Sequence, residues 1–199
     1  MRLNPATARC GSCLLGVSLL TLLAVTLPPE WQNLMQFQHR TIAGGELWRL
    51  LSGHLLHLGW KHLLMNLLGL WLIWALLLRS ESNGSCILVL CLVALGTSLG
   101  LYLLSPQIAW YRGLSGVLHG LLVWALLKQW RSSPLTHGII LGLLALKLAW
   151  EQTAGPLPGS AELVSGRIVV EAHLYGALSG ALLWAVQLGT DKITREITE

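Results

Sequence analysis

Residues 57–78 read HLGWKHLLMNLLGLWLIWALLL, and this stretch sets the fold class. After Lys61, no aspartate, glutamate, lysine or arginine occurs before Arg79. A helix needs about 20 mostly apolar residues to cross a bilayer. His57–Leu78 is therefore predicted to be a transmembrane helix that carries polar side chains near its start.

The same pattern recurs on both sides of that stretch. Turn-forming residues separate five further apolar segments, which are Cys10–Leu27, Cys86–Leu104, Leu114–Trp130, Thr136–Trp150 and Ile168–Leu188. The segment 136–150 fits a spanning helix least well, because it is short and contains Lys147. Residues 1–199 are thus predicted to form a single all-α polytopic membrane domain, a bundle of six transmembrane helices.

Composition excludes most soluble functions. Charged residues make up 11% of the chain and hydrophobic residues 54%, whereas ordinary soluble domains contain about 25% charged residues. The net charge of +4 is small and not clustered, so nucleic acid is not an expected partner. The lipid bilayer is the expected environment.

Basic residues give a weak indication of orientation. In a six-helix bundle both termini share one side, together with seven basic residues: Arg2, Arg9, Arg79, Lys128, Arg131, Lys192 and Arg195. Cytoplasmic loops carry an excess of lysine and arginine, so cytoplasmic termini are expected. The first segment has the basic flank of a signal peptide, but no clear A-x-A cleavage site follows it, and a retained helix is expected.

The long segment Pro28–Leu56 mixes tryptophan, leucine and charged residues, among them Trp31 and Trp48. Tryptophan is enriched at membrane interfaces, where its ring and its N–H meet different environments. The segment is predicted to be an interfacial hairpin in the outer leaflet.

The four cysteines lie at or inside apolar segments. Cys10 and Cys13 form a CxxC, but no second CxxC completes a zinc site, and Cys86 and Cys91 follow far along the chain. Because free cysteine behaves as a small buried hydrophobe, unreactive thiols are expected.

A first polar cluster begins the second apolar segment. It contains His54, His57, His62 and Asn66. His62 and Asn66 are four residues apart and share one helix face, so both can direct N–H donors at one point, as stabilisation of an oxyanion requires. Hydrogen bonding between neighbouring helices is the alternative reading.

A second cluster is Gly113-Leu114-Ser115-Gly116, at the expected start of a helix. The N–H groups of a first helical turn have no intrahelical partner, and the helix dipole is positive there. Ser115 is therefore a candidate nucleophile, although small residues also serve as packing surfaces in membranes. His119 is one turn later, where it would support the site or act as base, a task for which two side chains on one helix are poorly placed.

A third cluster begins with His173, followed by Gly176 and Gly180. The two glycines form a GxxxG face that permits close helix packing. If this face packs against the glycines around Ser115, His173 can act as the general base. Periodicity alone does not establish that pairing.

No carboxylate is expected to orient His173, because Glu171 falls on the opposite face of its helix. Lys147 and Glu151 are four residues apart, and a local ion pair explains them; a proton or ion pathway is the alternative. The predicted site is therefore a dyad.

A metal site is a competing interpretation, since imidazole binds zinc, copper and nickel. The His-Glu-x-x-His motif of metalloproteases is absent, and no carboxylate in the spans is expected beside the histidines. No metal and no cofactor is expected for the five histidines in or near spans, His54, His57, His62, His119 and His173.

Together the clusters resemble the rhomboid family of intramembrane serine proteases. The resemblance covers essentially the whole chain and rests on four motifs in the family's order, namely Glu46-x-Trp48-Arg49, His57-x4-His62-x3-Asn66, Gly113-x-Ser115-Gly116 and Ala172-His173-x2-Gly176-x3-Gly180. The motifs are weak singly, and their ordered combination is specific.

The resemblance implies that Ser115 is the nucleophile and His173 its base, with an oxyanion hole formed by His62, Asn66 and the Ser115 N–H. It implies a first-loop interface at Glu46, Trp48 and Arg49, and supporting positions at His57, Gly113, Gly116, His119, Gly176 and Gly180. The implied substrates are transmembrane protein segments.

One departure points to a branch of the family. Many bacterial rhomboids carry a tyrosine where this chain has His119, and the surrounding stretch looks more like the rhombosortases. That branch is associated with removing a C-terminal Gly-Gly-containing anchor from exported proteins, which implies a bacterial inner-membrane protein whose site opens to the periplasm. The alternative is a non-catalytic rhomboid-like protein that binds transmembrane segments for sorting or quality control.

Overall fold

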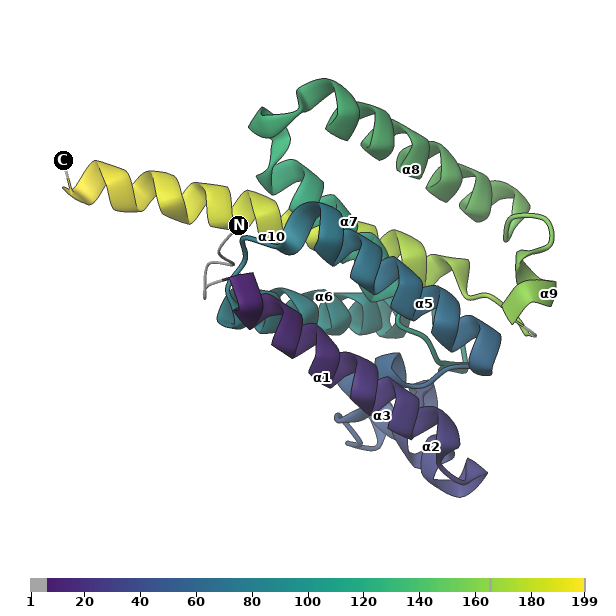
Figure 1. Cartoon of the computed structure of the whole chain (residues 1–199). Helices are drawn as coiled ribbons and strands as arrows, with labels where there is room; N and C mark the ends of the chain where they lie inside the picture. Colours follow the sequence, from purple (N-terminus) through teal and green to yellow (C-terminus); the bar gives the residue numbers. More distant parts are fainter. Residues whose placement is uncertain (1–6, 165, 199) are drawn as a thin grey trace.

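The computed structural model describes the backbone of residues 7–164 and 166–198, and side chains from residue 10 to residue 190 except residue 165. Arg2 lies outside the described residues, and so do the side chains of Arg9, Lys192 and Arg195. The described chain is a bundle of helices with a small irregular segment at one end (Figure 1).

Six long helical stretches fall on the six apolar segments. They are α1 (Thr7–Thr26), α5 (Trp60–Ile73) with its π-helical continuation η2 (Trp74–Leu78), α6 (Asn83–Leu104), α7 (Ser115–Lys128), α8 (Pro134–Ala154) and α10 (Val170–Thr198). Within the described residues, two of them, Trp60–Leu78 and Asn83–Leu104, are long and apolar enough by themselves to cross a membrane. The predicted number of six spans therefore stays a prediction.

The helix ends follow local chemistry. The Ser82 hydroxyl accepts a hydrogen bond from the Ser85 N–H at the start of α6, as an N-cap should. Pro134 begins α8, where a missing N–H costs nothing. The same helix ends before Gly155, whose positive φ of 83° favours glycine. A short 3-10 turn, η3 (Trp130–Ser132), connects α7 to α8.

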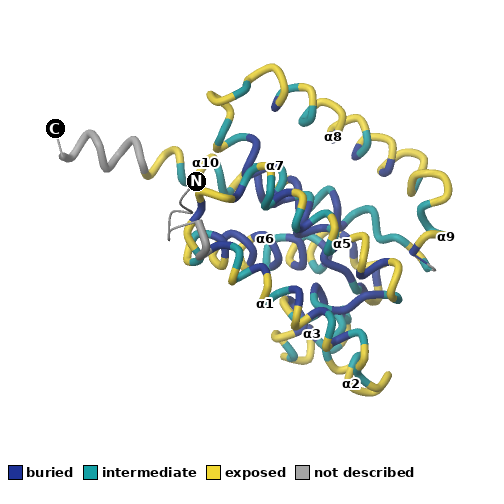
Figure 2. The backbone as a smooth tube through the Cα atoms, in the orientation of Figure 1, coloured by how far each residue is buried: buried dark blue, intermediate teal, exposed yellow. Residues whose placement is uncertain are grey.

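Helix α7 is the centre of the bundle, and most of its residues are buried (Figure 2). Its Trp124 and Leu121 lie in the main apolar core with residues of α1, α5 and α6. Helix α8 is at the edge and is exposed along much of its length. Only its inward face packs, through Leu144 and Leu148 against Val123 and Ala177.

Between α1 and α5 the chain forms a compact segment rather than a free loop. It contains α2 (Pro29–Met35), β1 (Phe37–Gln38), α3 (His39–Ala43), α4 (Arg49–Ser52) and the 3-10 turn η1 (Gly53–Leu55). Strand β1 pairs antiparallel with β2 (Trp110–Tyr111), with Phe37 opposite Tyr111. This two-residue pairing anchors the segment to the chain just before α7, while its placement in the outer leaflet stays a prediction.

The expectation of four unreactive thiols is wrong. Cys10 and Cys86 are joined by a disulfide, while Cys13 and Cys91 are free. The two bonded cysteines stand near the starts of α1 and α6, 76 residues apart in sequence. Their proximity depends on how two helices pack side by side, which a spacing pattern does not encode.

The outer surface of the bundle is rich in leucine. Leu68, Leu76 and Leu135 each expose 70% or more of their surface, and many further large apolar residues are exposed around them. Soluble monomers rarely expose contiguous apolar patches of more than a few hundred Å². A lipid environment accounts for such a surface.

Candidate active site

Ser115 and His173 lie in hydrogen-bond contact at one end of the bundle. Ser115 is the first residue of α7, and His173 lies in the first turn of α10. The distance between Ser115 Oγ and His173 Nε2 is 2.9 Å. His173 is 6% exposed. A hydroxyl and an imidazole at this distance can share a proton.

Glycines bring the two helices together. A Cβ added at Gly176 or Gly180 of α10 would overlap the carbonyl groups of Gly116 and Gly120 on α7. A Cβ added at Gly116 would lie 2.7 Å from the carbonyl oxygen of Ala172. The helices therefore pack backbone against backbone, which is the approach that small-residue faces allow.

His62 presents an N–H toward the backbone just before Ser115. Its Nδ1 accepts a hydrogen bond from the Leu58 N–H at 3.3 Å, so the proton of the neutral ring is on Nε2. That edge faces the backbone before Ser115, because a Cβ added at Gly113 would lie 3.3 Å from His62 Nε2. Gly113 has a φ of 147°.

Asn66 is buried in the same place, on the same face of α5 as His62. Its side-chain Nδ2 has no hydrogen-bond partner among the described residues. An unmade hydrogen bond on a buried donor costs about 1–3 kcal/mol. A donor held in this state next to a candidate nucleophile is suited to a transient negative charge.

A cavity of about 280 Å³ joins these groups. Residues of α5, α7, α8 and α10 line it, and so do residues of the 155–164 region, which includes α9 (Ser160–Val164). Its polar side chains include His62, Asn66, Ser115 and His173. The three predicted clusters thus meet around one hollow.

The expectation that no carboxylate would reach His173 is wrong. Glu151 Oε2 lies 2.9 Å from His173 Nδ1, and Glu151 is 4% exposed. Lys147 Nζ donates to Glu151 Oε1 at 2.8 Å, so the local ion pair exists but is also part of the site. The stripe of Leu144, Leu148 and Glu151 gave the missed signal, because these spacings put Glu151 on the buried face of its helix.

His119 stacks on the imidazole of His173. The two rings are stacked, with centroids 4.3 Å apart and an interplanar angle of 13°. His119 Nδ1 lies 2.7 Å from the Ser115 carbonyl oxygen. Its other nitrogen, Nε2, lies 2.9 Å from Lys147 Nζ. Both nitrogens are therefore engaged away from the serine hydroxyl.

The remaining predicted support residues surround this centre. His57 is buried with its ring edge-on to His62, at a centroid distance of 5.0 Å. His54 was not in the predicted site but contacts its backbone, with Nδ1 3.2 Å from the Gly113 oxygen. Tyr111 donates a hydrogen bond to the same oxygen at 2.6 Å.

Burial shifts two ionisations next to this backbone. Loss of hydration lowers the pKa of His54 to about 4 and raises the pKa of Tyr111 to about 12. Both groups are therefore neutral near pH 7. They hold the Gly113 carbonyl without adding charge.

Glu46, Trp48 and Arg49 are not brought to the cavity. Arg49 is 3% exposed, binds the Glu46 carboxylate, and donates to the backbone oxygens of Asn33 and Gln36. Trp48 Nε1 donates to the Leu34 oxygen at 3.1 Å. These three residues hold together the compact segment before η1.

Among the described residues, His119, Glu151 and His173 form one group with the composition of a metal site, with ligand atoms within 4.8 Å of one another. The Lys147 ammonium lies within 3.5 Å of all three side chains. Such an ammonium already supplies a positive charge where a metal ion would stand. His54, His57 and His62 are not part of the group.

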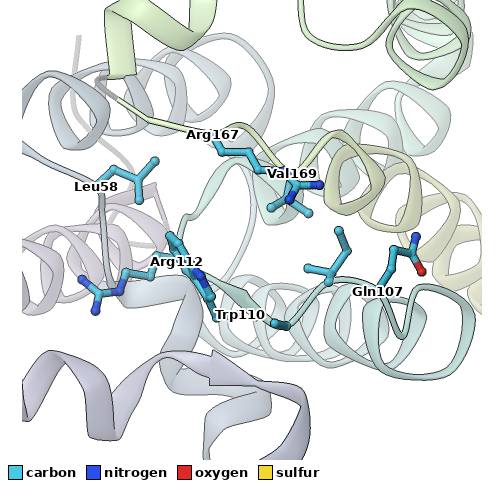
Figure 3. A pocket seen from close by; sticks show the side chains of 8 residues that line it. Leu58, Gln107, Trp110, Arg112, Arg167 and Val169 are labelled. Atoms are coloured by element: carbon cyan, nitrogen blue, oxygen red, sulfur yellow. The ribbon is translucent and has the colours of Figure 1, made fainter.

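A second, smaller cavity of about 100 Å³ lies beside β2, between Trp110, Arg167 and Val169 (Figure 3). Arg112 lines it, but its guanidinium points away and donates to Gln36 and to two side chains of α2, Gln32 and Asn33. None of Ser115, His173 or Asn66 lines this cavity.

Two comparisons with known proteins identify relatives of this chain. The family profile described as "Rhomboid domain" matches residues 44–189. A protein of Bacillus subtilis (strain 168), "Putative rhomboid protease YdcA", is 27% identical over 157 residues, which cover 77% of this chain and 73% of the relative.

Proposed function

The chain belongs to the rhomboid family of integral membrane proteins, to which intramembrane serine proteases belong, and from this premise we propose that Ser115 and His173 catalyse peptide-bond hydrolysis in membrane-embedded protein segments. One observation carries the assignment, namely the 2.9 Å contact between Ser115 Oγ and His173 Nε2. It joins the ends of two helices that are far apart in sequence at a cavity large enough for part of a peptide.

The proposed reaction begins with attack of Ser115 Oγ on the scissile carbonyl carbon. The hydroxyl proton passes to His173 Nε2 as the new carbon–oxygen bond forms. The carbonyl oxygen becomes an oxyanion that accepts hydrogen bonds from His62 Nε2–H, Asn66 Nδ2 and the Ser115 N–H. His173 then returns the proton to the leaving amine, and a water molecule repeats the cycle on the acyl-enzyme.

The decisive experiment separates catalysis from binding. Detergent-solubilised protein is treated with a fluorophosphonate probe, which labels an activated serine. Wild-type protein and Ser132→Ala, which changes a serine in η3 beyond the far end of α7, are expected to label, and Ser115→Ala is expected not to. Labelling that persists in Ser115→Ala contradicts the nucleophile assignment, and failure of the wild type to label favours the non-catalytic alternative.

For the substrate, we propose the C-terminal Gly-Gly-containing anchor that the rhombosortase resemblance implies. A helical segment must unwind before Ser115 can reach its carbonyl, and each glycine destabilises a helix by about 1 kcal/mol relative to alanine. Two features support this proposal. One is the sequence around His119, and the other is the set of glycines that lets the backbones of α7 and α10 approach closely at the site. In cells, the C-termini of exported membrane proteins are expected to be shortened only when Ser115 is present.

A matched substrate pair tests the glycine requirement directly. An anchored reporter with Gly-Gly at the cleavage region is expected to be cut faster than the same reporter with Ala-Ala. Equal cleavage of both reporters leaves the protease assignment intact and removes the Gly-Gly proposal.

For location, we propose the bacterial inner membrane, with both termini cytoplasmic and the Ser115 end facing the periplasm. The support is the excess of basic residues on the terminal side. Seven lie there, against five on the other side, which are Arg40, Arg49, Lys61, Arg112 and Arg167. Of two reporters fused after residue 199, one that works only in the cytoplasm is expected to be active, and one that works only in the periplasm is expected to be inactive. Activity of a periplasm-dependent reporter at that position contradicts the orientation.

A further inference from the structure

We infer that Glu151 is a positioning residue for His173, held in place by Lys147, so that α8 completes a Ser115–His173–Glu151 triad. This inference deepens the proposed function and rests on it. It assigns α8, which is exposed along much of its length, a part in the site.

The contact with Glu151 determines which nitrogen of His173 is the base. Glu151 Oε2 lies 2.9 Å from His173 Nδ1. An ionised carboxylate only accepts hydrogen bonds, so Nδ1 must carry the proton of the neutral ring. The unprotonated nitrogen is then Nε2, which faces Ser115 Oγ. Without Glu151 nothing at Nδ1 selects this tautomer over the inactive one.

Lys147 keeps Glu151 ionised and aimed. A buried carboxylate without a partner carries a large desolvation cost, and Lys147 Nζ supplies the opposite charge at 2.8 Å from Oε1. Because Lys147 occupies Oε1, the second oxygen, Oε2, is left for His173. Lys147 is one turn before Glu151 on α8, so the two side chains leave the helix on one face.

The same ammonium fixes the supporting histidine. Lys147 only donates, so His119 Nε2 accepts from it at 2.9 Å. His119 Nδ1 then carries the proton and donates to the Ser115 carbonyl oxygen at 2.7 Å. The chain of contacts leaves Ser115 through its hydroxyl, passes through His173, Glu151, Lys147 and His119, and returns to the backbone of the same serine.

The charges around His173 explain why a carboxylate is needed there. The groups that face its ring are Lys147 and Glu151 from α8, His119 and Ser115 from α7, and His62 from α5. Glu151 is the one carboxylate among these described neighbours. When the serine proton moves to Nε2, the imidazolium gains its stabilisation from Glu151, which itself stays unprotonated throughout.

The experiment compares two buried, lysine-paired carboxylates. Glu151→Gln keeps the shape of the side chain, but Lys147 claims its single carbonyl oxygen and turns the amide N–H₂ toward His173 Nδ1. The wrong tautomer is then favoured, which in the serine-protease template costs about 10⁴-fold in kcat. The matched control is Glu81→Gln, because Glu81 is 8% exposed and pairs with Lys128 at 2.8 Å far from the cavity.

For a reporter substrate, Glu151→Gln is expected to lower kcat by roughly 10²–10⁴-fold with little change in KM. Glu151→Asp, which keeps the charge but withdraws it, is expected to recover part of the loss. Glu81→Gln is expected to keep the wild-type kcat even if it unfolds at a lower temperature. An unchanged kcat in folded Glu151→Gln overturns the triad, and activity of Ser115→Ala would instead overturn the proposed function.

A measurement on the wild-type protein keeps the inference testable if Glu151→Gln does not fold. Nitrogen NMR of protein labelled at histidine, with His173→Ala as the assignment control, reports the tautomer of His173 near neutral pH. Protonation at Nδ1 supports the triad, and protonation at Nε2 of a neutral ring overturns it.

Discussion

Gly176 of α10 lies directly against the carbonyl group of Gly116 on α7, with no room between them for even a methyl group. This contact is three residues from His173 and one residue from Ser115. Ser115 and His173 are 58 residues apart in sequence. Their hydrogen bond therefore depends on glycine at positions 116 and 176, because any side chain there would keep the two helices apart.

Gly176→Ala is expected to push α10 away from α7 and to separate the hydroxyl from the imidazole. The added methyl group can be accommodated only if a helix moves, because the obstructing atoms belong to the backbone and not to a flexible side chain. Loss of fluorophosphonate labelling and a lower unfolding temperature in detergent are expected together. The matched control is Gly189→Ala on the same helix, where nothing lies within 4 Å of an added Cβ and alanine favours the helix. Normal labelling of Gly176→Ala would show that the close approach is dispensable.

Asn66→Ala is expected to slow cleavage by roughly 10²–10³-fold, the usual effect of removing one oxyanion donor. The unfolding temperature should hardly change, since the Nδ2 group gives up no hydrogen bond to any described residue. Kinetics and thermal unfolding on the same preparation check both halves of the prediction. A large loss of stability with the rate retained would make Asn66 a structural residue.

The fold could be predicted from sequence to the level of helix positions. Apolar length placed all six long helical stretches, and Pro134 and Gly155 mark the limits of α8 as their backbone chemistry requires. The compact segment around β1 could not be predicted in detail, because its pairing with β2 joins residues more than 70 positions apart. The Cys10–Cys86 bond was missed for the same reason.

The site, too, could be predicted where its residues are close in sequence and not where they meet across helices. His62 and Asn66 share one helix face, so their convergence follows from a single period. The meeting of Ser115 with His173 followed from a resemblance and not from spacing. Glu151 was assigned only to its neighbour Lys147. An ion pair between residues i and i+4 already accounts for both charges, so neither charge required a partner on another helix. The spacing of Glu151 from Leu144 and Leu148, which puts all three on the face of α8 that is buried, was the sequence signal for such a partner.

His119→Phe and His119→Ala are expected to differ. Phenylalanine keeps a flat ring against His173, where the present rings are 4.3 Å apart, so most of the kcat should survive. Alanine leaves the imidazole free to turn, and kcat should fall further than in the phenylalanine variant. Steady-state cleavage of one reporter by both variants measures the difference. Equal activities would mean that the stacked ring at position 119 does not contribute to kcat.

Stability is expected to fall with acid through His54, which lies in η1 outside the spanning helices. Its ring is 2% exposed, lies 3.0 Å from the Ala94 oxygen, and has its pKa lowered from 6.5 to about 4 by burial. Between these two pH values the unfolded chain binds a proton that the folded chain does not, so stability rises with pH across that window. Above pH 6.5 both states are neutral at this residue and the contribution is complete. Tyr111, whose pKa is raised to about 12, stays neutral throughout and does not change the pH dependence of stability.

Thermal unfolding in detergent from pH 7 down to pH 4 is therefore expected to show a smaller fall in unfolding temperature for His54→Gln than for the wild type, even if the variant starts from a lower temperature. Parallel curves for the two proteins would mean that His54 is protonated in the folded state or that its proton is not coupled to unfolding.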